Sequence, residues 1–230
     1  MSEKKINLPS VTYVGILANV KDNGDLEKLL KIGHETSKGI NFHKKVIYSC
    51  LDPDGETYDF EVVKIDTQEY DYYTKWFLEN LRHFFDSDFM INFHADGMIQ
   101  NPEAWTDEFL DYDYIGAPWN SAEEGGNGGF ALRSKLLCEA ASKIDTSTNT
   151  PQTGLWDNED VLICKTHAEF MKGEGVKFAP AELAARFSTE HFSFNSQGYS
   201  ESFGFHEIEK LFMPDVKDHR QKFLKGVLGL

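Results

Sequence analysis

The chain has 230 residues, of which 40% are hydrophobic and 13% aromatic, and it carries a formal net charge of -15 at pH 7. This composition is typical of a folded globular protein and excludes a disordered chain. The negative charge disfavours nucleic acid and anionic lipid as partners, because both are bound through phosphates that need clustered lysine and arginine.

The cysteines and the apolar segments bear on the cellular compartment. Cys50, Cys138 and Cys164 are an odd number at wide spacing, which fits neither a disulfide framework nor a zinc site. The N-terminal residues lack the apolar core of a signal peptide, and no apolar run approaches the ~20 residues of a membrane span. We therefore expect a soluble, cytoplasmic protein.

The N-terminal part of the sequence predicts strands that alternate with helices. Short β-rich apolar runs are separated by turn-forming residues, and apolar residues at helical spacing follow two of these runs. An aspartate cluster beginning at Asp22 is a helix-start signal. The expected strands are 11–17, 46–51, 60–65 and 89–93, and the expected helices begin near Asp22 and Thr67.

The C-terminal part continues the same pattern with more glycine and proline. Pro118 stops a strand or places it at a sheet edge, and the glycine-rich residues 125–129 predict a mobile loop. We expect a strand at 113–119, helices at 131–142 and from Asp157, and a strand at 176–179.

One mixed α/β domain is the simplest organisation, because the sequence shows neither an internal repeat nor a linker-like change of composition. Strands that alternate with helices favour a largely parallel central sheet flanked by helices. Ligands of such sheets bind beyond the carboxyl ends of the strands. Candidate chemistry is therefore expected where strands end.

The first candidate site follows the apolar strand 89–93. His94 and Asp96 are two residues apart, so in an extended chain both side chains point to the same side, and Gly97 permits a sharp turn. Mg²⁺ and Mn²⁺ take one or two protein carboxylates and complete their shell with phosphate oxygens and water. Asp96 and Gly97 are equally typical of a plain turn, with His94 as an ordinary half-buried histidine.

The second candidate site is the acidic run that includes Asp157, Glu159 and Asp160. A carboxylate here could act as a general base that takes a proton from an acceptor hydroxyl. Acids are also favoured in a first helical turn, and Asp157 with Asp160 resembles a capping box. Position alone favours capping.

Two further segments are weaker candidates. Residues 125–129 match neither a P-loop nor a dinucleotide-binding fingerprint, and only the amide of Asn127 suggests recognition of sugar hydroxyls. His206 alone is typical of a structural histidine. The aromatic residues from Phe192 to Phe205 are more typical of a core or a lid than of a sugar-stacking surface.

Taken in order, these segments resemble the GT-A class of nucleotide-sugar glycosyltransferases. The resemblance is closer to a small family of glycosyltransferase domains of unknown specificity, and it extends over about residues 89–206. The combination of motifs is more specific than any one of them. The matching segments are 89–97, 109–119, 126–133, 158–161, 177–180 with 184–188, and 204–206.

The resemblance implies a GT-A fold with a role for each segment. The donor nucleotide would bind to residues 11–100, and the acceptor and the catalytic groups to residues 101–210, before a tail at 211–230. Asp96 would contact a divalent metal, Mn²⁺ or Mg²⁺, on the donor diphosphate, and His206 would return to that metal. The usual Asp-x-Asp motif of these enzymes has an acid where this sequence has His94. We keep His94 as a third candidate ligand. Glu159 or Asp160 would be the base, and the sugar pocket would include Trp119, Asn127, Gly128, Gly129 and Phe130.

The activity expected from this resemblance is sugar transfer from a nucleotide-sugar donor to a saccharide or another hydroxyl-bearing acceptor. Direct displacement assisted by a carboxylate base would invert the configuration of the sugar. His94 in place of an acid also allows an inactive nucleotide- or sugar-binding module. A different enzyme with the same α/β architecture and metal use, a sugar nucleotidyltransferase or donor hydrolase, is a further alternative. A more specific version of the main interpretation is a transferase acting on modified nucleic-acid bases, which the negative charge disfavours.

Overall fold

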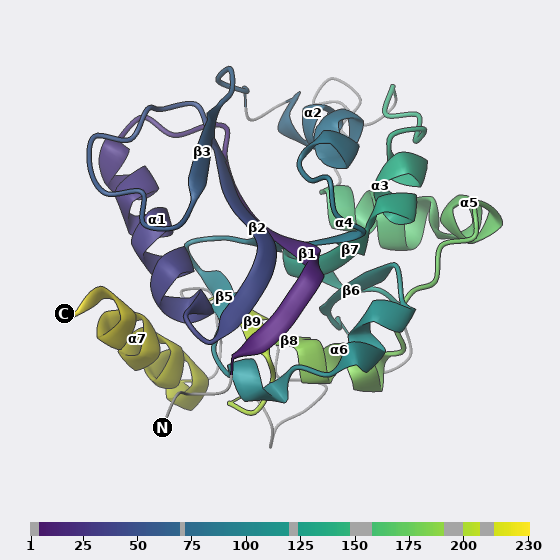
Figure 1. Ribbon diagram of the computed structural model, residues 1–230. Coiled ribbons are helices and arrows are strands. Elements are labelled where there is room, and N and C mark those ends of the chain that lie inside the picture. The colour runs from purple at the N-terminus through teal and green to yellow at the C-terminus, as the bar shows by residue number, and fades with distance from the viewer. Residues whose placement is uncertain (1–4, 70–71, 120–123, 148–157, 191–199, 208–213) are drawn as a thin grey trace.

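A computed structural model of the chain describes residues 5–69, 72–119, 124–147, 158–190, 200–207 and 214–230. Its centre is a sheet of six strands in the order β3-β2-β1-β4-β7-β6 (Figure 1). The first four strands in this order are parallel to one another, whereas β7 is antiparallel to both β4 and β6. The strands are β1 (Ile6–Leu17), β2 (Ile40–Ser49), β3 (Glu61–Lys64), β4 (Phe89–Phe93), β6 (Tyr114–Ala117) and β7 (Asn127–Ser134).

Helices cover both faces of this sheet, each over its own apolar cluster. Leu26, Leu29 and Leu30 of α1 (Asn23–Ser37) and Leu183 of α6 (Ala181–Phe187) pack with the cluster that includes Ile91 and Phe93. The opposite cluster contains side chains of the other helices. These are α2 (Tyr73–Asn80), α3 (Lys135–Ala141), a π-helix (Leu162–Thr166) that follows α4 (Glu159–Val161), and α5 (Ala168–Gly173).

A second, small sheet lies at the end of the central one. It has the order β5-β9-β8, with β5 (Gly97–Ile99), β9 (Gly204–His206) and β8 (Ser188–Thr189). The last helix, α7 (Pro214–Leu228), lies beside α1, where Lys31 Nζ donates to the carbonyl oxygen of Leu228 at 2.6 Å (Figure 1). The apolar residues Phe223 and Leu224 of α7 pack toward Met98 and Phe205. This helix occupies the segment that the sequence alone suggested to be a tail.

The expected fold class is confirmed, and most expected strands lie where the sequence placed them. β4 coincides with the predicted strand 89–93, and Asp22 caps α1 by accepting a hydrogen bond from the Gly24 N–H at 2.8 Å. α2 begins at Tyr73, later than the predicted start at Thr67. Within the described ranges, no helix is both long enough and apolar enough to cross a membrane.

Two predictions around β7 were wrong. The predicted helix 131–142 begins only at Lys135, and most of the predicted loop 125–129 belongs to strand β7, which starts at Asn127. Ala131 and Leu132 favour helices by intrinsic propensity, but here both pair with β4, and Leu132 also pairs with β6 on the other side. Tertiary pairing therefore outweighs local propensity at this strand.

Candidate functional site

The first part of the site is the tight turn that follows β4. The backbone of His94 pairs with that of Gly97, with the His94 N–H donating to the Gly97 carbonyl oxygen at 2.8 Å. This turn joins β4 to β5 and carries His94 and Asp96 at its corners. The turn and the ligand interpretations of this motif are therefore compatible with one another.

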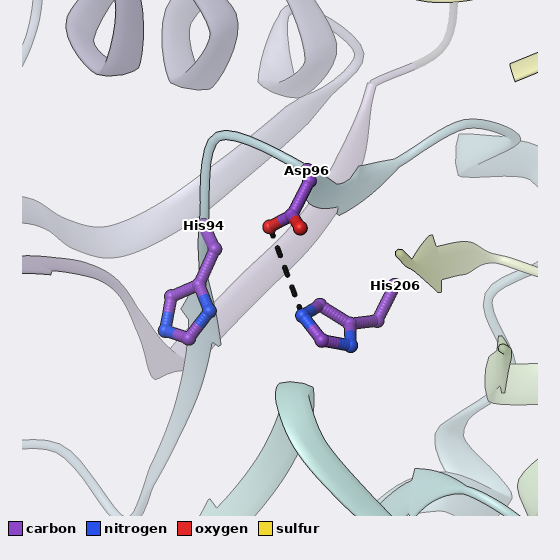
Figure 2. Close-up of side chains that lie close together, drawn as sticks. All are labelled: His94, Asp96 and His206. Atoms are coloured by element: carbon purple, nitrogen blue, oxygen red, sulfur yellow. Dashed lines mark ion pairs between the residues drawn. The ribbon is translucent and has the colours of Figure 1, made fainter. Parts of the chain in front are cut away.

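Strand pairing in the small sheet brings His206 next to this turn. In the antiparallel pairing of β5 with β9, His206 lies opposite Gly97, the neighbour of Asp96. The three side chains point toward a common centre (Figure 2), and their nearest ligand atoms all lie within 4.8 Å of one another. His206 Nε2 is 3.7 Å from Asp96 Oδ1. The structure therefore brings together the three residues that the sequence suggested as metal ligands.

The other ring nitrogen of His206 is held by Glu190, which was not predicted from the sequence. His206 Nδ1 lies 3.2 Å from Glu190 Oε1, and Glu190 is 6% exposed. A carboxylate that accepts from one imidazole nitrogen fixes the ring with its other nitrogen free for a metal. His206 Nε2 faces Asp96 in this arrangement. Glu190 therefore gives His206 the orientation of a metal ligand.

The two histidines differ in their affinity for protons. Burial lowers the pKa of His94 to about 4, and the nearby charge of His206 acts in the same direction. Burial also disfavours the charged form of His206, but the hydrogen bond with Glu190 and the charges of Asp96, Glu190 and Glu207 outweigh it and raise its pKa. His94 is thus neutral near pH 7, the form in which imidazole binds metals.

Gly128 and Gly129 lie between the cluster of His94, Asp96 and His206 and a second group of charged residues. A Cβ on Gly129 would lie 2.1 Å from His206 Nε2, and one on Gly128 would lie 2.5 Å from Glu159 Oε1. Real Cβ atoms do not approach other atoms so closely, so only glycine fits while His206 and Glu159 keep these positions. The glycines at the start of β7 therefore allow both groups to approach the same backbone.

The second group consists of Glu159, Asp160 and the buried Arg133. Arg133 Nη2 donates to Glu159 Oε1 at 2.9 Å and to the Gly128 carbonyl oxygen at 3.2 Å. Asp160 accepts from the Gly128 N–H with Oδ2 and from the Val161 N–H with Oδ1, both at 2.8 Å. Asp157, the suggested capping partner of Asp160, lies outside the described residues. Asp160 therefore anchors the start of β7 in addition to its place at a helix start.

Asp160 and Glu159 differ in access to solvent. Asp160 is 5% exposed, whereas the side chain of Glu159 is 18% exposed. Burial, together with the neighbouring charge of Glu159, raises the pKa of Asp160 to about 6, although the two backbone N–H groups and Arg133 act in the opposite direction. A carboxylate with a pKa near the working pH is suited to general acid–base catalysis. Asp160 has a pKa suited to a base, and Glu159 is the more accessible to solvent, so both residues remain candidates for the base.

Asn127, Trp119 and Phe130 are the remaining residues of the predicted sugar pocket. Asn127 is half-buried, and its Oδ1 accepts from the Gly129 N–H at 2.7 Å. Trp119 is half-buried too, with Lys165 Nζ 4.3 Å from the centroid of its ring. Phe130 is fully buried and stacks on Phe187 with ring centroids 5.3 Å apart. The side chain of Phe130 is therefore part of the core.

Three solved structures of glycosyltransferases resemble this fold. A glycosyltransferase involved in the glycosylation of the major capsid of PBCV-1 matches 96% of this chain and 100% of its own, with 12% identity and a TM-score of 0.54. Galactosyltransferase LgtC, solved with donor and acceptor sugar analogues, matches 94% and 95% of the two chains, with 10% identity and a TM-score of 0.45. GlyE of Streptococcus pneumoniae TIGR4 matches 98% of this chain and 62% of its own, with 10% identity and a TM-score of 0.48. The likeness to the PBCV-1 enzyme shows a shared fold.

The sequence comparisons point to a family rather than to a characterised protein. No curated protein matches the sequence. A family model described as a protein of unknown function, DUF5672, matches residues 60–206, which include both candidate ligands of the β4 turn, the acidic pair and His206. Because this match covers more than half of the sequence, the chain belongs to the DUF5672 family.

Proposed function

We propose that this protein is a glycosyltransferase that moves a sugar from a nucleotide-sugar donor to an acceptor hydroxyl. The observation that carries the proposal is the cluster of His94, Asp96 and His206 at the carboxyl end of the central strand β4. Ligands of open α/β sheets bind at this end of the strands. The fold shared with the PBCV-1 glycosyltransferase supports the same assignment.

The donor atoms of this cluster fit a divalent cation of the first transition series. Two imidazoles and one carboxylate suit Mn²⁺ better than Mg²⁺, which prefers oxygen ligands. Asp96 is the most accessible of the three, with 44% of its side chain exposed, so a diphosphate could share its metal. A bound metal would offset the charge that develops on the departing nucleotide.

The acidic pair supplies the second chemical contribution in this proposal. Asp160 or Glu159 takes the proton from the acceptor hydroxyl, and the acceptor oxygen attacks the anomeric carbon from the side opposite the nucleotide. Both residues lie at Gly128, adjacent to the glycine that His206 contacts. The charge of Glu159 also acts on His94, which is consistent with a single site. Direct displacement inverts the sugar configuration.

The binding surfaces are proposed from the residues around these two groups. We place the donor toward residues 11–100 and the acceptor toward residues 101–210 of one domain. The Nδ2 group of Asn127, for which the described residues offer no hydrogen-bond acceptor, is available for a sugar hydroxyl. Because the proposed metal ligands come from both halves, we infer that the donor diphosphate would lie at their boundary.

A thermal-shift screen of nucleoside diphosphates and nucleotide sugars, with and without Mn²⁺, tests the proposal. A ligand that binds only the folded state must stabilise it. We expect one nucleotide class to stabilise the wild type in the presence of Mn²⁺ and to have no effect on Asp96→Ala. Asp111→Ala, which removes an exposed carboxylate from another part of the surface, is the matched control and should behave as wild type.

Transfer itself is tested by supplying the stabilising donor with mixed saccharide acceptors and analysing the product. A product with inverted anomeric configuration supports the mechanism, and a retained configuration overturns the direct displacement. Donor binding without release of nucleotide under any condition would favour the inactive binding module that His94 suggests. The absence of stabilisation by every nucleotide would contradict the proposed function.

A further inference from the structure

The C-terminal helix α7 contributes one buried side chain, Arg220, that contacts the backbone at His206 and next to Glu190. Arg220 is 1% exposed, although it lies on a helix at the surface of the molecule. Its guanidinium lies over the ring of Phe205 in β9, with Cζ 4.6 Å from the ring centroid. A buried arginine is costly unless its donors are satisfied, so its contacts indicate its role.

The donors of Arg220 bind the backbone on both sides of the Glu190–His206 pair. Nη1 donates to the carbonyl oxygens of His206 and Glu207, each at 2.9 Å. Nη2 donates to the carbonyl oxygen of Thr189 at 2.8 Å and to its Oγ1 at 2.9 Å. Thr189 directly precedes Glu190, and Glu207 directly follows His206. One guanidinium therefore joins the ends of β8 and β9.

These contacts come just beyond the ladder between β8 and β9, whereas His206 itself still pairs with Gly97 of β5. The ladder between β8 and β9 includes only Ser188 with Gly204 and Thr189 with Phe205 among the described residues. Beyond it, Glu207 has a φ of 73°, a left-handed conformation that non-glycine residues rarely adopt. The backbone that directs Glu190 and His206 toward each other is thus held in part by hydrogen bonds from Arg220, which lies outside the sheet.

We propose that Arg220 is a positioning residue for metal binding, an inference that rests on the proposed function of the His94, Asp96 and His206 cluster. Arg220 holds His206 and Glu190 in the orientation in which His206 Nε2 faces Asp96. The planar fork of arginine is suited to this task, because it binds several carbonyls in fixed directions, whereas lysine carries a single compact ammonium. Helix α7, docked on α1 through Lys31, thereby becomes part of the site.

The experiment measures the dissociation constant of Mn²⁺ alone by calorimetry on metal-free full-length protein. The variants are Arg220→Met, Arg220→Lys and, as a matched loss of positive charge from the exposed face of α7, Lys225→Ala. We expect about 10- to 100-fold weaker Mn²⁺ binding in Arg220→Met, the range for loss of an outer-shell partner. Arg220→Lys should be intermediate, and Lys225→Ala should bind as wild type does.

Thr189→Val provides a milder test that keeps the arginine. It removes the Oγ1 acceptor of Arg220, together with the contact of that hydroxyl with Ser202 Oγ at 3.2 Å, and leaves the bond of Arg220 to the Thr189 carbonyl oxygen in place. It should weaken Mn²⁺ binding by roughly 2- to 5-fold, about the effect of one hydrogen bond. It decides the question if both Arg220 variants fail to fold. Excess Mn²⁺ should also restore nucleoside diphosphate binding to Arg220→Lys, because mass action fills a weakened metal site.

The outcomes separate this inference from the proposed function. A wild type that does not bind Mn²⁺ overturns both. A wild type that binds Mn²⁺, together with folded Arg220 variants of unchanged affinity, overturns the role of Arg220 alone. If only Thr189→Val folds, unchanged affinity in that variant has the same meaning.

Discussion

The imidazole of His206 lies directly against the backbone of Gly129, so closely that a single added methyl group would overlap its Nε2 atom. Gly97, which pairs with His206 across the small sheet, has the same relationship to the ring, with a Cβ position 2.8 Å from His206 Cδ2. The position of His206 is therefore fixed by two glycines on one side and by Glu190 on the other.

Replacing Gly129 with alanine should displace His206 and weaken Mn²⁺ binding by at least about 10-fold, with a loss of about 1–3 kcal/mol of stability from overpacking. Calorimetric titration with Mn²⁺ and urea unfolding measure the two effects. Gly226→Ala is the matched control, because a methyl group added there would have no neighbouring atom within 4 Å. Equal Mn²⁺ affinity in Gly129→Ala and wild type would remove His206 from the metal site.

Asp160→Asn should lower kcat by about 10²- to 10⁴-fold while leaving donor binding nearly unchanged, the range expected for loss of a general base. Glu159→Gln is the paired variant, because it keeps a side-chain oxygen for Arg133 Nη2. Steady-state kinetics with the donor identified by thermal shift measure both variants. Full turnover in Asp160→Asn with a large loss in Glu159→Gln would transfer the role of base to Glu159.

Asp160 should make the free energy of unfolding of the protein depend on pH. Its pKa is raised from 3.8 to about 6 on folding, so between about pH 4 and pH 6 the folded state holds a proton that the unfolded state has lost. Stability from this group is therefore present at low pH and is lost as pH rises through this window, by roughly 3 kcal/mol for about two pKa units.

The difference in free energy of unfolding between wild type and Asp160→Asn isolates this contribution, since the other titrating groups are shared. Urea unfolding at several pH values from about 4 to about 7 should show the wild type losing stability relative to the variant as pH rises. A difference that does not vary with pH would show that Asp160 keeps an ordinary pKa in the folded protein.

Phe187→Ala should destabilise the fold by about 3–5 kcal/mol, as expected for removal of a buried aromatic side chain. Phe187 directly precedes β8 and is fully buried, with ring centroids 5.2 Å from Phe109 and 5.5 Å from Phe203. Urea unfolding measures the loss. Phe170→Ala, at a position that is 38% exposed on α5, should change stability far less, and similar losses in the two variants would contradict this packing argument.

The sequence allowed prediction of the parts of the fold whose signals are local. The apolar run of β4, the cap at Asp22 and the alternation of strands and helices all follow from neighbouring residues. The start of β7 does not, because its residues are glycines and helix formers that become a strand by pairing with β4 and β6. Helix α7 was also missed, since its apolar residues Phe223 and Leu224 are few and are separated from the others by charges.

The candidate site was predictable to the extent that its residues come directly after a strand or within a recognisable motif. His94 and Asp96 have that signal, and His206 was identified by resemblance. Glu190 and Arg220 have no local pattern that distinguishes them from other charged residues, because their roles come from contacts across the small sheet. The sequence does not show that Arg220 is buried, because the carbonyl groups that accept its hydrogen bonds belong to segments distant along the chain.

The pairing of β5 with β9 has a consequence for the growing polypeptide during synthesis on the ribosome. His94 and Asp96 emerge long before His206, and Arg220 emerges later still. The nascent chain can complete the central strands β1, β2 and β4 first, but it cannot bring together all three residues of the proposed metal site until β9 has emerged and paired. Acquisition of the ion would then be a late step that marks a chain whose distant segments have come together correctly.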